Sequence, residues 1–232
     1  MSRQINDKKL ITYLNPDSPI SEAYRSLRTN IQFSSVDEPV QTIIVTSADS
    51  GDGKTTTIAN LAVAYAQEGK RVLVVDADLR KPSLHALFSQ SNQIGLTNIL
   101  TNQVAWQEAV RETKIDNLEF IGSGPTPPNP SEILGSKRMK ALIEELKGQF
   151  DIILFDAPPA LIVTDGLVVA SMCDGVVFVI NVGTTKRGQA EKVYASLEHV
   201  KARVLGAVLN NKKRKDKDAF YYRYYGKTAG SN

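Results

Sequence analysis

The chain has few of the residues that build disulfide bridges and zinc sites. It contains one cysteine, Cys173, and two histidines among its 232 residues. Because a single thiol cannot pair within the chain, no internal disulfide forms and a reducing compartment is expected. Thiol and imidazole ligands are too few for a structural zinc site. We expect Cys173 to be a small residue of the core.

Long apolar runs are also missing. None reaches the ~18–20 residues that a membrane-spanning helix needs, and the N-terminus lacks the apolar centre of a secretory signal. Hydrophobic residues make up 42% of the sequence, and no long linker rich in glycine, serine or proline divides it. We therefore expect one large α/β domain without a membrane-spanning or secretory segment.

The most informative stretch is VTSADSGDGKTTT, from Val45 to Thr57. An apolar run stops there at a small, glycine-bearing turn, and helix-forming residues follow, which predicts a strand, a tight loop and a helix. The amides of such a loop and the helix N-terminus point at one spot, which suits a polyphosphate. Lys54 adds a fixed cation and Thr55 a hydroxyl for Mg²⁺. We predict that nucleotide phosphates bind to Ser50, Gly51, Asp52, Gly53, Lys54, Thr55 and Thr56.

This motif has one departure from the usual spacing. Ala48 stands where the pattern GxxxxGK[ST] has its first glycine. The Gly-Lys-Thr end directly after a strand is the part that chance rarely produces. The alternative interpretation is an ordinary helix start with a solvated lysine.

Short apolar segments alternate with helix-forming stretches along the chain. Strands are predicted near 42–47, 72–76, 118–121, 151–155, 175–181 and 204–209, and helices at 21–31, 55–69, about 131–149 and about 187–202. The alternation predicts a doubly wound, mainly parallel sheet flanked by helices. Residues 122–130 are predicted to form an extended loop, with Ser131 as the cap of the helix after it. Trp106 is predicted to pack a helix rather than to bind a ligand.

Acidic residues follow two of the predicted strands. Asp76 and Asp78 come after the second strand, and Asp156 comes after the fourth. Because the carboxyl ends of parallel strands share one edge, these carboxylates gather near the phosphate loop, which is unfavourable unless a cation lies among them. Mg²⁺ with ATP is the natural cation. We predict metal contacts at Thr55, Asp76 and Asp156, and catalytic roles for Lys54, Asp76, Asp78 and Arg80.

Other interpretations stay open at these positions. Each aspartate taken alone also fits the cap of a turn or helix, since Asp is common after a strand. Asp76 or Asp78 is the candidate to accept a proton from an incoming hydroxyl. Arg80 and Lys81 either stabilise charge on a transferring phosphoryl group or form a solvated pair.

Positive charge is concentrated in residues 211–232. They carry seven Lys or Arg against two Asp, a net charge of +5 in a chain of net charge +3, so the remainder carries −2. Four of the eight tyrosines also fall here, at Tyr221, Tyr222, Tyr224 and Tyr225. A packed core cannot easily use such a run, and the alternatives are stacking on nucleic acid or an adhesive, disordered tail. We favour phosphate acceptors, because each phosphotyrosine adds about −1.5 to −2 charges and four would reverse the charge of the tail.

The tail begins near the predicted nucleotide site. The last predicted strand ends near Asn210, on the same edge of the sheet as the phosphate loop. From Asn210 to Tyr221 the chain spans at most roughly 36–40 Å when extended. That length reaches a neighbouring subunit at least as easily as the subunit's own site, so we predict phosphate transfer between subunits.

Together these motifs resemble those of the bacterial tyrosine kinases of capsule and exopolysaccharide synthesis, in the separate cytoplasmic form typical of Firmicutes. That family is a branch of the deviant-Walker P-loop ATPases, which include the septum-site and partition proteins. The resemblance covers roughly residues 20–226 and rests on GDGKT, VDADLR, LFDAPP and the terminal tyrosines. It implies an ATP-dependent protein-tyrosine kinase that phosphorylates its own terminal tyrosines and regulates polysaccharide synthesis.

The resemblance also implies partners and a division of the chain. A membrane adaptor with a cytoplasmic tail activates such kinases and recruits them to the inner face of the membrane, a tyrosine phosphatase reverses the reaction, and polysaccharide-synthesis proteins are substrates. No nucleic acid is expected. The family's subunit-contact motif, which supports a ring-shaped oligomer and commonly an octamer, is matched by Glu22, Arg25 and Arg28. The expected parts are an N-terminal arm at 1–19, a kinase domain at 20–210 with an oligomerisation helix at about 20–33, and a tail at 211–232.

The second interpretation is a septum- or partition-type ATPase whose basic tail binds DNA or membrane. It leaves the tyrosines unexplained. The partition-type relatives also carry a lysine at the position that Asp49 holds in this chain. A nucleotide-binding scaffold with negligible turnover is the third interpretation.

Overall fold

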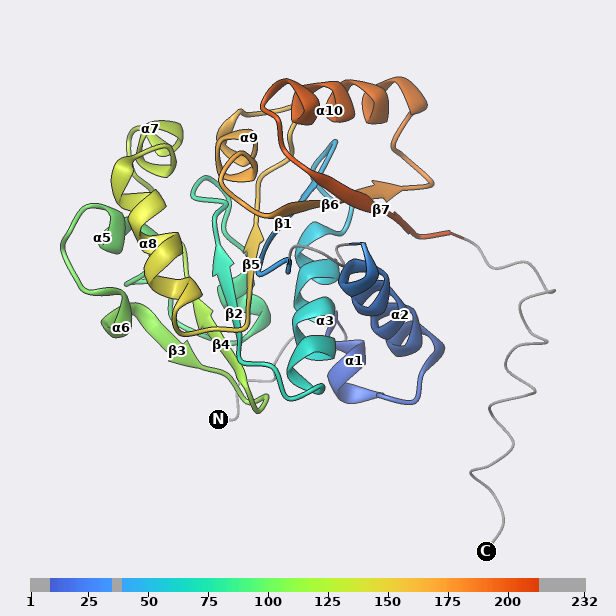
Figure 1. Cartoon of the computed structure of the whole chain (residues 1–232), viewed down its shortest axis with the longest axis horizontal. Coiled ribbons are helices and arrows are strands. Elements are labelled where there is room, and N and C mark those ends of the chain that lie inside the picture. The colour runs from blue at the N-terminus through green and yellow to red at the C-terminus, as the bar shows by residue number, and fades with distance from the viewer. Residues whose placement is uncertain (1–8, 35–38, 213–232) are drawn as a thin grey trace, which may run out of the picture.

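The chain folds around one central sheet (Figure 1). The structure, a computed structural model, describes residues 9–34 and 39–212. Within these ranges seven strands follow the order β3-β4-β2-β5-β1-β6-β7. They are β1 (Thr42–Ser47), β2 (Val72–Asp76), β3 (Val110–Glu112), β4 (Leu118–Ile121), β5 (Ile152–Asp156), β6 (Gly175–Asn181) and β7 (Val204–Asn210). Neighbouring strands pair in parallel, except that β3 is antiparallel to β4.

Helices cover both faces of this sheet, so the predicted doubly wound, mainly parallel architecture is confirmed. One face packs against α2 (Pro19–Phe33), α3 (Lys54–Ala66) and α4 (Leu84–Leu87), and α1 (Ile11–Leu14) packs on α2 and α3. The other packs against α5 (Leu96–Leu100), α6 (Trp106–Ala109), α7 (Pro130–Leu134), α8 (Lys137–Lys147), α9 (Asp165–Ala170) and α10 (Arg187–His199).

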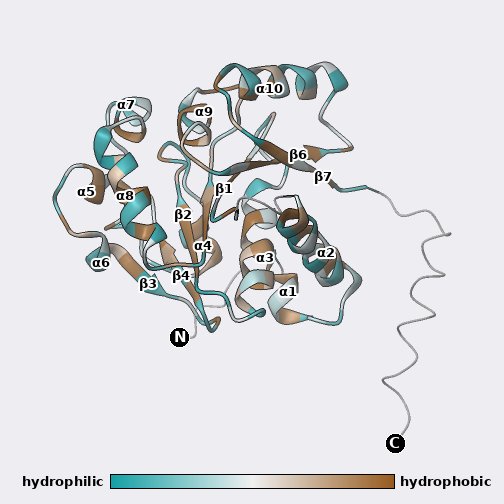
Figure 2. Ribbon diagram, in the orientation of Figure 1, coloured by the Kyte–Doolittle hydropathy of each residue, from teal (hydrophilic) through white to brown (hydrophobic). Residues whose placement is uncertain are grey.

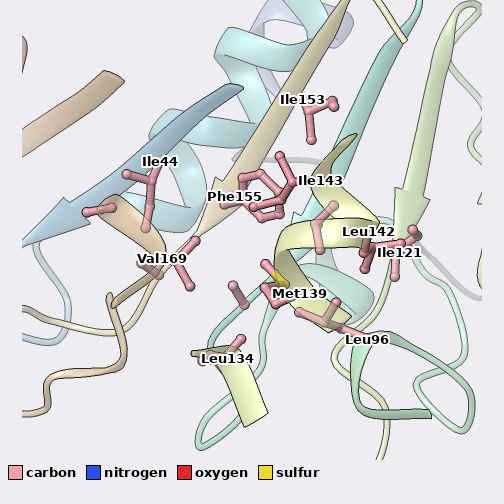
Figure 3. Packing of buried hydrophobic residues seen from close by; sticks show 14 of the residues in the cluster. Ile44, Leu96, Ile121, Leu134, Met139, Leu142, Ile143, Ile153, Phe155 and Val169 are labelled. Atoms are coloured by element: carbon pink, nitrogen blue, oxygen red, sulfur yellow. The ribbon is translucent and has the colours of Figure 1, made fainter. Parts of the chain in front are cut away.

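Strand β1 shows how the sequence builds both layers of the core. Ile44 packs into the cluster on the α8 face, whereas Ile43 and Val45 pack into the cluster on the α3 face. Figure 3 shows the first of these clusters, where Phe155 of β5 lies beside Ile143 of α8. The central strands are apolar along their length in Figure 2, as strands covered on both faces are. Each such buried side chain contributes roughly 1.5–3 kcal/mol to the free energy of folding. The well-packed sheet therefore gives the loops at its edge a rigid support.

The structure differs from three details of the predicted elements. The helix predicted at about 131–149 is two helices, because Ser136 caps α8 by accepting a hydrogen bond from the Met139 N–H at 3.2 Å. Ser131 is not a cap: it lies within α7, whose N-cap is Asn129. The edge strand β3 was not predicted, since two half-exposed residues and one exposed residue carry no clear apolar pattern.

Two expectations about packing are confirmed. Trp106 packs edge-on against Phe150, with ring centroids 6.3 Å apart, and joins the cluster on the α8 face. Cys173 packs against the same cluster, and burial raises the pKa of its thiol. Among the helices of residues 9–34 and 39–212, none combines the length and the apolar character that crossing a bilayer requires.

The N-terminal described residues pack on the helix that follows the phosphate loop. Helices α1 and α2 both contact α3, and Leu10 is buried in the same apolar cluster. Helix α2 begins at Pro19, with the Ser18 side chain accepting a hydrogen bond from the Ser21 N–H at 3.1 Å. The part of the predicted arm that the structure describes therefore packs on α2 and α3.

Candidate active site

The predicted phosphate loop joins β1 to α3. Gly53 is the N-cap of α3 and has a φ of 97°, a left-handed conformation that favours glycine. A Cβ atom at Gly53 would lie 2.1 Å from Asn210 Nδ2, because Asn210 donates a hydrogen bond to the Asp52 carbonyl at 2.8 Å. The last residue of β7 thus holds the backbone of the loop.

Lys54 lies inside the loop rather than in solvent. Its ammonium donates to Ser47 Oγ at 3.2 Å and to the Asp49 carbonyl at 3.4 Å, and the residue is only 8% exposed. Burial lowers the pKa of Lys54, although nearby carboxylates, with Asp156 the strongest, oppose the shift. Two long hydrogen bonds hold this cation, and a phosphate oxygen would replace them with a stronger charge-assisted contact.

Thr55 and Asp156 meet at the centre of the site. Thr55 Oγ1 donates to Asp156 Oδ2 at 2.7 Å and lies 3.0 Å from Ser83 Oγ. The other carboxylate oxygen, Asp156 Oδ1, is buried and has no hydrogen-bond partner among the described residues. Burial raises the pKa of Asp156 to about 7, while the Thr55 hydroxyl and Lys54 oppose the shift. A hydroxyl beside a buried carboxylate with a free oxygen is a donor set that fits a magnesium ion with its water ligands.

Asp76 and Asp78 have different surroundings. Asp76 is level with Asp156 across the β2–β5 pair, and it is fully buried. Its Oδ2 accepts the N–H groups of Ser83 at 3.0 Å and Leu84 at 3.1 Å, and its Oδ1 accepts the Asp78 N–H at 3.3 Å. Burial, together with the charge of Asp156, raises the pKa of Asp76 well above its usual value.

Asp78 is half-buried, at the mouth of the same strand edge. Its Oδ1 accepts the N–H groups of Arg80 at 3.3 Å and Lys81 at 2.9 Å. Both aspartates therefore cap backbone groups, as the alternative interpretation allowed, and both also lie near Lys54 or Asp156. Within the described ranges, no three acidic, histidine or cysteine side chains are grouped closely enough to hold a metal ion by themselves.

Arg80 is held away from solvent on one side by Asp165. Its Nε donates to Asp165 Oδ2 at 2.7 Å and its Nη2 to Asp165 Oδ1 at 3.2 Å. The Ser131 hydroxyl donates to the same carboxylate. Burial raises the pKa of Asp165, but the bonds from Arg80 and Ser131 outweigh it and leave that pKa below its usual value. Arg80 thus links the loop after β2 to α7 and α9.

A cavity of about 360 Å³ opens over the loop. Its lining combines hydroxyl groups, glycine backbone and two lysines, with an apolar wall from α4. The lining residues are Lys9, Gly51, Gly53, Lys54, Thr55, Thr56, Ser83, Ala86 and Leu87. Five of these, Gly51, Gly53, Lys54, Thr55 and Thr56, belong to the seven predicted phosphate-binding positions. Ser50 and Asp52 lie in the same loop outside this lining, and Asp52 Oδ2 accepts the Asp49 N–H at 2.9 Å.

The predicted subunit-contact residues lie on α2. Arg25 pairs with Glu22 at 2.7 Å on the exposed side of that helix. Arg28 instead donates to the Ala64 carbonyl of α3 at 2.8 Å and lies 3.6 Å from Glu68. Arg28 therefore already has an intramolecular function, which the motif alone did not reveal. The predicted phosphorylation sites, Tyr221, Tyr222, Tyr224 and Tyr225, lie outside the described residues.

The sequence missed three residues of this site. Ser47 and Ser83 bond to Lys54 and Thr55, and Asn210 bonds to the loop backbone. Ser47 ends β1 and Asn210 ends β7, so a polar residue at the carboxyl end of a parallel strand was the signal that pointed to both. Ser83 carried no such signal, because it follows a turn rather than a strand.

Comparisons with known proteins agree with this geometry. The profile of a family described as an AAA domain matches residues 40–210. Tyrosine-protein kinase YwqD of Bacillus subtilis (strain 168) is 44% identical over 219 residues, which cover 94% of this chain and 92% of that protein. Putative tyrosine-protein kinase CapB of Staphylococcus aureus is 39% identical, over 94% and 95% of the two chains. The chain belongs to the bacterial tyrosine-protein kinases.

Solved structures place the kinase family closer than the septum-site proteins. The kinase domain of Escherichia coli tyrosine kinase ETK has a TM-score of 0.83 and 30% identity, covering 89% of this chain and 82% of its own. The septum site-determining protein MinD of Pyrococcus horikoshii, complexed with Mg-ADP, has a TM-score of 0.64 and 26% identity, covering 76% and 72%. The P-loop fold predicted for this kinase is therefore confirmed, and the septum-type interpretation is the more distant one.

Proposed function

We propose that this chain is an ATP-dependent protein-tyrosine kinase of capsule or exopolysaccharide synthesis. The observation that carries the proposal is the Lys54, Thr55 and Asp156 arrangement at the foot of a cavity lined by the phosphate loop. Its named relatives of similar length are tyrosine-protein kinases. The site needs a polyphosphate and a cation to satisfy its charges, and ATP with Mg²⁺ supplies both.

Each residue of the proposed site has a distinct role. The loop amides and Lys54 hold the phosphate chain and stabilise charge on its oxygens during transfer. Thr55 and Asp156 Oδ1 would hold Mg²⁺, which neutralises charge on the transferring group when bound. Asp76, whose oxygens accept backbone N–H groups, shapes the turn that places Ser83 beside Thr55. We therefore locate the metal contact at Thr55 and Asp156, and assign Asp76 to the support of the loop.

The transfer step also requires a proton acceptor. The tyrosine oxygen attacks the terminal phosphorus, the bond from that phosphorus to ADP breaks, and the phenolic proton must leave. Asp78 is half-buried at the mouth of the site, whereas Asp76 is fully buried. Asp78 is therefore the residue that takes the proton. Arg80, held by Asp165, is the adjacent cation of the same loop.

The proposed acceptors are Tyr221, Tyr222, Tyr224 and Tyr225 of a neighbouring subunit. Strand β7 ends at Asn210, whose side chain bonds to the phosphate loop. The terminal segment therefore starts beside the nucleotide site of its own subunit. An extended reach of roughly 36–40 Å to the first tyrosine is ample for an adjacent subunit in a ring.

Intact-mass measurement after incubation with ATP and Mg²⁺ tests the activity. Stepwise additions of phosphate, lost when the four tyrosines are replaced by phenylalanine, are the expected result. Hydrolysis of ATP without any addition of phosphate would instead support the septum-type interpretation. Asp49 gives that interpretation little support, since its carboxylate accepts a hydrogen bond from Gln189 at 2.8 Å where partition-type relatives carry a lysine.

A mixing experiment tests the direction of transfer. A Lys54→Met subunit with intact tyrosines is combined with an active subunit in which the four tyrosines are phenylalanine. Phosphate on the Lys54→Met subunit is expected, because transfer runs between subunits. No label on that subunit would refute transfer between subunits while leaving the kinase activity itself intact.

The proposed partners follow from family membership. We propose a ring-shaped homo-oligomer, a membrane adaptor that activates the kinase and recruits it from the cytoplasm to the membrane, an opposing tyrosine phosphatase, and polysaccharide-synthesis proteins as substrates. We propose that the adaptor acts by raising the affinity of this site for ATP. ATP titrations with and without the adaptor's cytoplasmic peptide test this, and equal affinities would contradict it.

A further inference from the structure

Lys9 brings a second cation to the cavity over the phosphate loop. Among the described residues that line this cavity, only Lys9 and Lys54 are charged, and none is acidic. The two lysines come from segments far apart in the sequence, Lys54 from the loop and Lys9 from the chain that precedes α1. Lys9 is exposed, so its long side chain keeps its freedom to reach a ligand in the cavity.

Asn60 of α3 fixes the backbone that carries Lys9. Its Nδ2 donates to the Lys9 carbonyl at 2.7 Å and to the Thr56 carbonyl at 2.8 Å, while its Oδ1 accepts the Thr12 N–H at 2.9 Å. The Asn60 side chain is completely buried, and these bonds satisfy its polar groups. Because Thr56 lines the cavity, one buried amide ties the cavity wall to the segment that holds Lys9.

Apolar packing holds the same segment in place. Leu10 is 4% exposed and belongs to the cluster on the α3 face, and Thr12 is completely buried. The backbone from Lys9 to Thr12 is therefore held in position by its contacts with α3. Because this segment is fixed, the backbone of Lys9 has a defined position at the wall of the cavity.

We propose that Lys9 is a nucleotide-binding residue that contacts the phosphate chain of ATP from the segment packed on α3. The inference rests on the proposed function, which supplies the nucleotide, and goes beyond it by adding a residue from outside the family's motifs. A triphosphate carries more negative charge than Lys54 and one Mg²⁺ together offset. A second lysine in the lining of the cavity is complementary to that charge.

Calorimetric titration of the full chain with ATP and Mg²⁺ tests the proposal. Lys9→Gln should weaken ATP binding by roughly three- to tenfold, as expected for the loss of one charge contact near the surface. Lys9→Arg should restore the affinity. Adenosine, which lacks phosphates, should bind equally to wild type and Lys9→Gln.

Lys140→Gln is the matched control. Lys140 is an exposed lysine of α8, on the opposite face of the sheet, and its replacement removes the same charge from the chain. Its ATP affinity should equal that of wild type, and the thermal unfolding of Lys9→Gln should be unchanged. ATP affinities that agree between Lys9→Gln and Lys140→Gln would overturn the inference and leave the kinase proposal standing. A wild-type chain that binds no ATP would instead overturn the proposed function.

Discussion

Asp76 and Asp78 are separated by one residue, yet the structure gives them different chemistry. Asp76 is fully buried in the sheet, and both of its carboxylate oxygens accept hydrogen bonds from backbone N–H groups of the turn that carries Ser83. Asp78 stands at the mouth of the site and caps Arg80 and Lys81 with one oxygen. Asp76 is the last residue of β2 and lies level with Asp156 inside the sheet, whereas Asp78 follows the end of the strand.

The first prediction separates these two residues by kinetics. Asp78→Ala should lower kcat by roughly 10²–10⁴-fold, since it removes the proton acceptor, with little change in ATP affinity. Asp76→Ala should weaken ATP binding, because Leu84 and the cavity-lining Ser83 lose the acceptor of their N–H groups. Single-turnover phosphorylation gives the rate, and fluorescence titration with a labelled nucleotide gives the affinity. Unchanged kcat in Asp78→Ala would show that another group takes the proton.

Motif residues of the site were predictable, and their supports were not. Lys54 and Thr55 belong to a loop pattern, and Asp156 ends an apolar strand, so their meeting follows from the parallel sheet alone. Ser83 and Lys9 reach the same cavity through a turn and a short N-terminal segment. Their positions depend on tertiary packing, which no local pattern in the sequence encodes.

At the scale of elements, buried strands and long helices were the predictable part. Strands covered on both faces are continuous apolar runs, and six of the seven described strands were located from that signal. The remaining one, β3, is short and half-exposed, and it pairs with the edge of the sheet. The break between α7 and α8 depends on a single serine cap, Ser136, inside a long helix-forming stretch.

Asp174 ties three elements together at the other end of the sheet from the site. Its Oδ2 accepts the N–H groups of Gln41 at 3.0 Å and Thr42 at 2.8 Å, at the start of β1. Its Oδ1 accepts the ammonium of Lys147, the last residue of α8, at 3.0 Å. Burial raises the pKa of Asp174, but the bonds from Thr42 and Lys147 outweigh it, so that pKa lies below its usual value.

The second prediction follows from that lowered pKa. The folded-state pKa of Asp174 lies below the unfolded one, so its contribution to stability is present above the unfolded value and is lost as the pH falls through the folded value. Asp174→Asn should cost about 1–2 kcal/mol at pH 7, and the difference from wild type should shrink as the pH falls below about 4. Urea unfolding across that range measures it. Asp116→Asn, an exposed control, should match wild type, and a difference that persists in acid would contradict the prediction.

At the scale of the whole molecule, two distant parts of the chain converge on the phosphate loop. The segment at Lys9 to Thr12 is pinned to α3 by Asn60, and the end of β7 is pinned to the loop by Asn210. Helix α2 lies against α3 on the same face of the sheet (Figure 1). A subunit contact made by α2 would therefore act on the helix that begins at the phosphate loop.

The two arginines of α2 differ in what they hold. Among the described residues, Arg25 bonds to Glu22 and to the Pro16 carbonyl, both close to it in sequence, and 31% of its side chain is exposed. Arg28 is 16% exposed and donates to the Ala64 carbonyl near the end of α3. Replacing both at once would mix a loss of subunit contact with a loss of packing inside the subunit.

Single replacements separate these effects and give the last prediction. Arg25→Ala should shift the oligomer to smaller mass in sedimentation velocity with thermal unfolding of the subunit unchanged, because its hydrogen bonds lie on the surface of α2. Arg28→Ala should lower the free energy of unfolding by about 1–3 kcal/mol, since the Ala64 carbonyl loses a charged donor. Arg187→Ala removes an exposed partner of Glu191 on α10 and should change neither quantity. An oligomer that keeps its mass in Arg25→Ala and in the double variant would show that α2 does not form the subunit contact.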